Sequence, residues 1–166
     1  MKCKIMNGII KDETLEGLES YAKSVELIPC QAWLGYHKYK DYDLTKLESS
    51  DIPESFLKVA NRVLPAFRSD QQYNKMVLRQ YNEGDEGKPH FDPRDVKGYV
   101  IVVPFGDYEG GTVIVDGNEE ELNPGDIMIR QATIGFSMGP RHSVSTVESG
   151  TMYTLEILTF VKEGIS

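Results

Sequence analysis

From about Tyr73 onward, the chain is a series of short apolar segments separated by turn sequences rich in glycine, proline, asparagine and aspartate. Each segment has the length and composition typical of a β-strand. The predicted strands are 75–81, 98–104, 112–115, 126–129, 133–138, 142–147 and 152–161, and the clearest turns are 82–87, 107–111, 116–118 and 123–126. Many short strands joined in this way bury their apolar faces by forming a sandwich or a barrel.

The first part of the chain carries helical patterns instead. Asp12 can cap a helix, and Pro53 fits the first turn of a second helix that ends near Pro65. The aromatic-rich segment 31–39 between them predicts a strand. The apolar residues that recur at helical spacing are Leu15, Leu18, Tyr21, Ala22 and Val25 in the first helix, and Phe56, Leu57, Val59, Ala60 and Val63 in the second.

The two regions are not separated by a linker, an internal repeat or a low-complexity segment. With 166 residues, the chain is long enough to bury one hydrophobic core. We therefore predict a single domain over 1–166, mainly β with flanking helices. Its helical support region (1–69) is expected to cover one sheet of a β core (70–166).

The charge balance of 18 basic against 26 acidic residues, a net charge of −8, disfavours long nucleic acids as partners. No apolar run approaches the ~18 residues of a membrane-spanning helix, and the first residues do not open a signal-peptide core. The two cysteines, Cys3 and Cys30, do not form a disulfide framework and fit a reducing compartment. We therefore expect a cytoplasmic protein without a membrane partner.

Two of the three histidines lie in contexts that suggest a metal site. His90 and Asp92 follow a glycine-rich turn, and residues two apart on a strand project to the same side. His142 opens a later predicted strand. Two imidazoles and one carboxylate suit Fe(II), Mn(II) or Co(II) better than a thiolate site would. His37 lacks such a context and is interpreted as a surface residue.

Together with the segments around them, these residues resemble the Fe(II)/2-oxoglutarate-dependent oxygenases, in particular their prolyl-4-hydroxylase-like branch. The matching motifs follow one another in the order and at the spacing of that family and cover about half of the chain. They are LRQYNEG (78–84), HFD (90–92), VVPFG (102–106), EGGT (109–112), LNPGDIMI (122–129), HSV (142–144) and GTMYTL (150–155). The resemblance implies a double-stranded β-helix, or jelly-roll, core with iron held at one mouth.

The resemblance also implies an activity. The family oxidises unactivated C–H bonds with O2 while 2-oxoglutarate is decarboxylated to succinate. It therefore implies Fe(II) as the metal, 2-oxoglutarate and O2 as co-substrates, and His90, Asp92 and His142 as the iron ligands. Tyr81 matches a tyrosine that commonly contacts 2-oxoglutarate in the family.

The sequence departs from the family where the far carboxylate of 2-oxoglutarate should bind. The family usually places an arginine or lysine nine or ten residues after the distal histidine, and these positions hold Thr151 and Met152 here. A buried dianion without a cationic partner would be costly. Arg79 is a candidate replacement because it lies two residues before Tyr81, on the same side of a strand. Arg130 is a weaker candidate.

Met152, Thr154 and Glu156 share one face of the last predicted strand. We predict that Met152 and Thr154 line the co-substrate site with Arg79 and Tyr81. An inward Glu156 can pair with Arg79 or recognise a cationic ligand, whereas an outward Glu156 is an ordinary strand residue. Two further interpretations stay open: an atypical Fe(II) enzyme with a different co-substrate or none, and a metal site without catalysis.

The favoured substrate is a protein side chain or a small amino-acid-like molecule. The turn 109–111 resembles that of family members with such substrates, and the last strand lacks the arginines typical of the branch that repairs nucleobases. Segments 40–43 and 93–97 are predicted to form the rim, where Arg94 and Lys97 can meet an acidic or polar substrate. The alternatives are a nucleic-acid-modifying oxygenase and a non-enzymatic jelly-roll binding module of cupin type.

Overall fold

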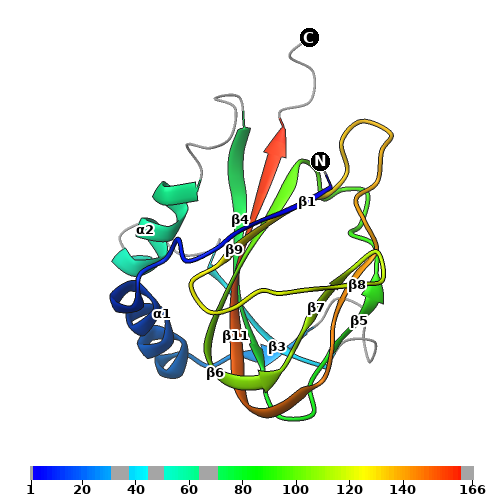
Figure 1. Ribbon diagram of the computed structural model, residues 1–166. Coiled ribbons are helices and arrows are strands. Elements are labelled where there is room, and N and C mark those ends of the chain that lie inside the picture. The colour runs from blue at the N-terminus through cyan, green and yellow to red at the C-terminus, as the bar shows by residue number, and fades with distance from the viewer. Residues whose placement is uncertain (1, 31–37, 45–50, 64–70, 162–166) are drawn as a thin grey trace.

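The computed structural model describes residues 2–30, 38–44, 51–63 and 71–161. Within these ranges two antiparallel sheets face each other, and two helices lie outside one of them (Figure 1). This architecture confirms the predicted mainly β class with a jelly-roll core and flanking helices. The elements are β1 (Cys3–Met6), α1 (Asp12–Ser24), β2 (Ile28–Pro29), β3 (Lys40–Asp43), α2 (Glu54–Val63), β4 (Gln71–Tyr81), β5 (Gly87–His90), β6 (Tyr99–Gly110), β7 (Val113–Val115), β8 (Asn118–Glu120), β9 (Ile127–Gln131), β10 (His142–Val144) and β11 (Val147–Val161).

The chain passes repeatedly from one sheet to the other. The larger sheet has the strand order β1-β9-β6-β11-β4-β3-β2, and the smaller sheet has the order β5-β10-β7-β8. From β4 onward the strands therefore alternate between the sheets, with only the β7–β8 hairpin making two successive strands in one sheet. This alternation is the winding of a jelly roll, and each sheet therefore pairs strands that are distant in the sequence, such as β5 with β10 and β4 with β11.

The side chains on the two faces of the long strands of the larger sheet have different surroundings. On β11, Leu155 and Ile157 are fully buried against the helices, in a core cluster that includes Phe56. The alternate residues Thr154 and Glu156 point to the other face and line a cavity between the sheets. Residues two apart on a strand share a face, so one strand supplies both the structural core and the cavity wall.

Both predicted helices are confirmed, and both cover the outer face of the larger sheet. Leu18, Phe56 and Val59 are fully buried there. Asp12 was predicted to cap α1, but Lys11 holds the N-cap position and Asp12 lies in the first turn, where its charge still favours the helix dipole. Neither of these two described helices combines the length and the apolar character that crossing a bilayer requires.

One predicted strand and one predicted turn are wrong. Segment 133–138 forms a tight turn, closed by two backbone hydrogen bonds between Ile134 and Ser137. Gly135 has φ +58° in that turn, a left-handed conformation that a strand does not contain. The predicted turn 107–111 belongs largely to β6, which continues to Gly110.

Three short strands come from the region that was predicted to be helical. β1 pairs with β9, and β2 and β3 extend the sheet beyond β4. Edge strands are commonly short and charged, and such segments show little alternation of apolar and polar residues. Of the predicted strand 31–39, residues 31–37 lie outside the described ranges, and the pairing of β3 begins at Lys40.

Phe56→Ala is expected to lower the free energy of unfolding by about 3–5 kcal/mol. The Phe56 ring is fully buried and packs edge-on against Tyr21, with ring centroids 5.1 Å apart, so truncation leaves a cavity beneath α2. Urea denaturation followed by circular dichroism measures the change. Phe136→Ala, at a fully exposed phenylalanine, is the matched control and should change stability by less than about 0.5 kcal/mol. Equal losses in the two variants would contradict this core assignment.

Candidate metal centre

Two strands of the smaller sheet bring the predicted metal ligands together. β5 ends at His90, β10 begins at His142, and their antiparallel pairing sets these two residues opposite each other. The imidazole centroids are 4.3 Å apart. The possible ligand atoms of His90, Asp92 and His142 all lie within 4.8 Å of one another. This spacing suits three ligands on one face of a single ion.

Asp92 lies at the site, but its backbone is not in the strand that was predicted to carry it. β5 ends at His90, so Asp92 follows in a loop instead of sharing a strand with it. Phe91 between them is 46% exposed. The expectation that both side chains meet at one site therefore agrees with the structure, but strand alternation is not the reason. From this loop, Asp92 Oδ1 lies 3.4 Å from His142 Nε2.

The backbone determines which nitrogen of each imidazole faces the site. His90 Nδ1 is 2.7 Å from the carbonyl oxygen of Lys88, and His142 Nδ1 is 2.9 Å from that of Pro140. A carbonyl oxygen only accepts hydrogen bonds, so each Nδ1–H donates, and in the neutral imidazole Nε2 carries the lone pair. Metal-ligating histidines are usually oriented by such a second hydrogen bond. His142 Nε2 lies 3.4 Å from Asp92 Oδ1, and Nε2 is the atom that each imidazole would present to a metal.

A buried arginine lies behind the carboxylate of Asp92. Arg130 Nη2 is 3.4 Å from each carboxylate oxygen, and the two side chains are 6% and 13% exposed. Burial alone would raise the pKa of Asp92, but Arg130 and the imidazoles of His142 and His90 outweigh it and hold that pKa well below its usual range. Asp92 is thus a carboxylate, the form that binds a divalent cation. Arg130, considered from the sequence as a weak partner for 2-oxoglutarate, instead contacts a predicted metal ligand.

A cavity of about 180 Å³ extends from these ligands into the space between the sheets. Three of the four residues predicted to bind the co-substrate line it: Arg79, Tyr81 and Thr154. Met152 points to the same face of β11, but it is fully buried in an apolar cluster with Tyr39 and Tyr81. The structure therefore places Met152 in the packing beside the cavity.

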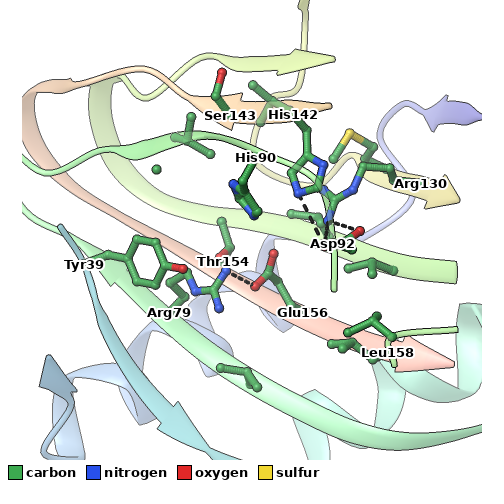
Figure 2. A pocket seen from close by; sticks show the side chains of 18 of the residues that line it. Tyr39, Arg79, His90, Asp92, Arg130, His142, Ser143, Thr154, Glu156 and Leu158 are labelled. Atoms are coloured by element: carbon green, nitrogen blue, oxygen red, sulfur yellow. Dashed lines mark hydrogen bonds and ion pairs between the residues drawn. The ribbon is translucent and has the colours of Figure 1, made fainter. Parts of the chain in front are cut away.

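On the wall formed by β4 and β11, Arg79 contacts two carboxylates, those of Glu156 (Figure 2) and Asp41. Arg79 Nε donates to Asp41 Oδ1 at 2.8 Å, and Nη1 contacts Glu156 Oε2 at 2.5 Å. The guanidinium carbon lies 4.3 Å from the centroid of the Tyr39 ring. Burial alone would lower the pKa of Arg79, but Glu156 and Asp41 raise it well above its ordinary value. The guanidinium is therefore charged and held from both sides.

Two residues of this wall received no role at the site from the sequence. Tyr39 was assigned only to the predicted strand 31–39, and Asp41 was part of the predicted rim segment 40–43, which forms β3. Asp41 lies opposite Arg79 in the β3–β4 register. A short charged segment does not reveal which strand it will pair with, so the sequence carried no signal for this contact. Glu156, left open between two orientations, points inward.

No protein-family model and no curated protein matches the chain. Several solved structures do match. The viral collagen prolyl hydroxylase vCPH from Paramecium Bursaria Chlorella virus-1, in its 2OG complex, gives a TM-score of 0.73 at 14% identity, over 98% of this chain and 97% of that one. A prolyl hydroxylase from Trichoplax adhaerens, in complex with a peptide fragment of hypoxia inducible factor, gives 0.75 at 12% identity, over 96% and 84%. HygX from Streptomyces hygroscopicus, with nickel and 2-oxoglutarate bound, gives 0.72 at 9% identity, over 98% and 84%.

These similarities confirm the resemblance at the level of the fold, which is that of the 2-oxoglutarate- and Fe(II)-dependent oxygenases and prolyl hydroxylases. At identities of 9 to 14% they show the fold alone. A fold hosts many activities, so function is argued from the site. Here the site is the cluster of His90, Asp92 and His142, whose ligand atoms could hold one metal ion.

His142→Ala is expected to weaken binding of Co(II), used as a stable substitute for Fe(II), by more than about 100-fold. Mutating a residue that only hydrogen-bonds to a metal ligand typically lowers metal affinity by about 10- to 100-fold. Removal of the ligand itself should lower it further. Anaerobic titration followed by the visible absorption of Co(II) measures it, and His90→Ala should behave alike. His37→Ala, at the third histidine, is the control and should bind normally. Normal binding by His142→Ala would exclude this site.

Arg130→Met is expected to lower the free energy of unfolding of the metal-free protein by about 3 kcal/mol or more, because Asp92 is left as a buried charge without its partner. Bound Co(II) supplies a replacement positive charge, so part of the loss should be recovered in its presence. Urea denaturation with EDTA and with saturating Co(II) gives both values. Arg62→Met, on the exposed side of α2, is the control. An equal loss with and without metal would show that Arg130 does not act through Asp92.

Proposed function

We propose that the chain is a non-heme Fe(II) dioxygenase that uses 2-oxoglutarate and O2 to hydroxylate a protein side chain or a small amino-acid-like molecule. The observation that carries the proposal is the cluster of His90, Asp92 and His142, whose ligand atoms lie within 4.8 Å beside a cavity between the sheets. Neighbours in fold that were solved with 2-oxoglutarate support the choice of co-substrate.

The donor set fits Fe(II). Two imidazole nitrogens and one carboxylate oxygen are the ligands of non-heme iron oxygenases, and they leave other positions on the metal open. Bound iron would supply the activation of O2 for C–H oxidation. The chain's own contribution is orientation: the carbonyl groups of Lys88 and Pro140 hold the two imidazoles, and Arg130 holds Asp92.

2-Oxoglutarate fits this cavity with its far carboxylate at Arg79. A guanidinium stays charged and presents five N–H donors in a planar fork. The contacts of Arg79 with Asp41 and Glu156 are made by Nε and Nη1. Thr154 lies opposite Arg79 in the β4–β11 register, and its buried Oγ1 has no hydrogen-bond partner within the described part of the chain. That hydroxyl can donate to the same carboxylate.

Many of the other residues that line the cavity are apolar, and they strengthen these polar contacts. A low-dielectric surrounding with little water increases the interaction between a bound anion and a fixed cation. The wall also limits the groups that can reach the metal to those that fit between the two sheets. The apolar residues that line it include Val77, Val100, Val102, Val113, Met128 and Val144.

Peptides and small molecules are both plausible in size for this fold. One neighbour is described as a collagen prolyl hydroxylase, one was solved with a peptide fragment, and HygX was solved with hygromycin B. In the present chain, the loop after Asp92 carries the exposed Arg94 and the half-buried Lys97. These cations favour an acidic or polar substrate. The net charge of −8 makes a nucleic-acid substrate the weaker alternative.

Fe(II)-reconstituted protein is expected to convert 2-oxoglutarate to succinate with consumption of O2. Arg79→Ala should raise the KM for 2-oxoglutarate by about 100-fold or more, because the far carboxylate loses its charged partner. Succinate formation measures turnover. Equilibrium binding of 2-oxoglutarate to the Co(II) form gives a second measurement that does not require the hydroxylation substrate.

Controls separate this role from folding. Asp41 and Glu156 lose a partner in Arg79→Ala, so circular dichroism must show a folded variant, and Arg79→Lys should give an intermediate KM. Arg62→Ala should leave the KM unchanged. A normal KM in folded Arg79→Ala would exclude Arg79 as the partner. Absence of 2-oxoglutarate binding to the Co(II)-loaded wild type would point to another co-substrate or to a metal site without catalysis.

A further inference from the structure

Glu156 lies on the path between Arg79 and the predicted metal ligands. It projects from β11 into the cavity and is 9% exposed. One of its carboxylate oxygens contacts Arg79 Nη1 at 2.5 Å, and Figure 2 shows the carboxylate beside that guanidinium, on the side toward Asp92. A ligand that reaches from the metal to Arg79 therefore passes along Glu156.

Two carboxylates share one guanidinium on this wall. Among the described residues, Asp41 and Glu156 both contact Arg79, whereas Lys75, the other cation of β4 that lines the cavity, is exposed. The side chains of Arg79, Asp41 and Glu156 are 20%, 24% and 12% exposed, so water screens their interactions only in part. A ligand carboxylate at Arg79 would be the third negative group around one positive charge. A neutral group at the same place would add no such repulsion.

We propose that Glu156 determines which chemical group the cavity accepts at the far end of a metal-chelating 2-oxoacid. Glu156 competes with a ligand carboxylate for Arg79, so it weakens the binding of a dicarboxylate and leaves the cavity open to a ligand that ends in a neutral amide or hydroxyl. The buried Oγ1 of Thr154 offers such an end a hydrogen bond. This inference rests on the proposed function in one respect: the near end of the ligand chelates the metal.

Two matched probes test this selectivity on the Co(II)-loaded protein. N-Oxalylglycine is a non-reactive analogue of 2-oxoglutarate with a far carboxylate, and N-oxalylglycinamide is the same molecule with a far carboxamide. Glu156→Gln keeps an oxygen that accepts from Arg79 and removes the charge. We expect this variant to bind the dicarboxylate at least about tenfold more tightly than the wild type does. Its affinity for the amide should change by less than about threefold, because a neutral end gains little when one charge is removed.

Further variants identify the cause of the change. Arg79→Met in the Glu156→Gln background should remove the gain in dicarboxylate binding, since the gain requires the guanidinium. Thr154→Val, which keeps the shape of the side chain, should weaken binding of the amide by about 2- to 10-fold, the value of one neutral hydrogen bond. Glu148→Gln removes an exposed carboxylate from the same strand and should change neither affinity.

The outcomes separate this inference from the proposed function. If Glu156→Gln binds Co(II) normally but its affinity for N-oxalylglycine is unchanged or lower, the competition is excluded while the proposed function stands. If neither probe binds to Co(II)-loaded wild type or Glu156→Gln, both the inference and the 2-oxoglutarate site are excluded. If Glu156→Gln does not fold, the Thr154→Val result decides, and an unchanged affinity for the amide would overturn the inference.

Discussion

The antiparallel pairing of β10 with β5 is the contact on which the site depends. It sets His142 opposite His90 across the smaller sheet, although the two residues belong to distant parts of the sequence. The same two segments supply the carbonyl groups of Lys88 and Pro140 that orient the imidazoles. Position and tautomer of both candidate ligands therefore follow from the backbone of one strand pair. Asp92 lies in the loop after β5, where the buried guanidinium of Arg130 contacts its carboxylate.

The charged groups of the cavity depend on the two-faced strands of the larger sheet. β4 and β11 turn apolar residues toward the helices, and the same alternation turns Arg79 and Glu156 toward the smaller sheet. Charges in such a place are costly to desolvate, and a buried ion pair seldom stabilises a fold more than well-packed apolar residues would. Perturbed, paired charges in a cavity are instead typical of binding and catalytic sites. The paired charges of Arg79, Asp41 and Glu156 are therefore better explained by a ligand-binding role than by a purely structural one.

Much of the fold could be predicted from the sequence because the signals are local. Helical spacing predicted α1 and α2, and glycine and proline punctuation predicted most strands from β4 onward. The errors occurred where tertiary pairing decides the outcome. Segment 133–138 has the composition of a strand but forms a tight turn around Gly135, and the edge strands β1 to β3 are defined by the neighbours that they pair with. For the site, the residue types and spacing predicted His90, Asp92 and His142 together, whereas the contact of Arg130 with Asp92 was not foreseen.

By itself, the sequence determined the β class, the helical cover and the identity of the three candidate metal ligands, because strand and helix periods and ligand chemistry are properties of residues and their spacing. Only the tertiary structure decided which charges meet. Asp41, Arg79 and Glu156 come from three different strands, and their contacts follow from the order of β3, β4 and β11 in the sheet. The absence of a basic residue at Thr151 and Met152 was visible in the sequence. That Arg79 enters the cavity already paired with two carboxylates is a consequence of strand pairing, which no single segment encodes.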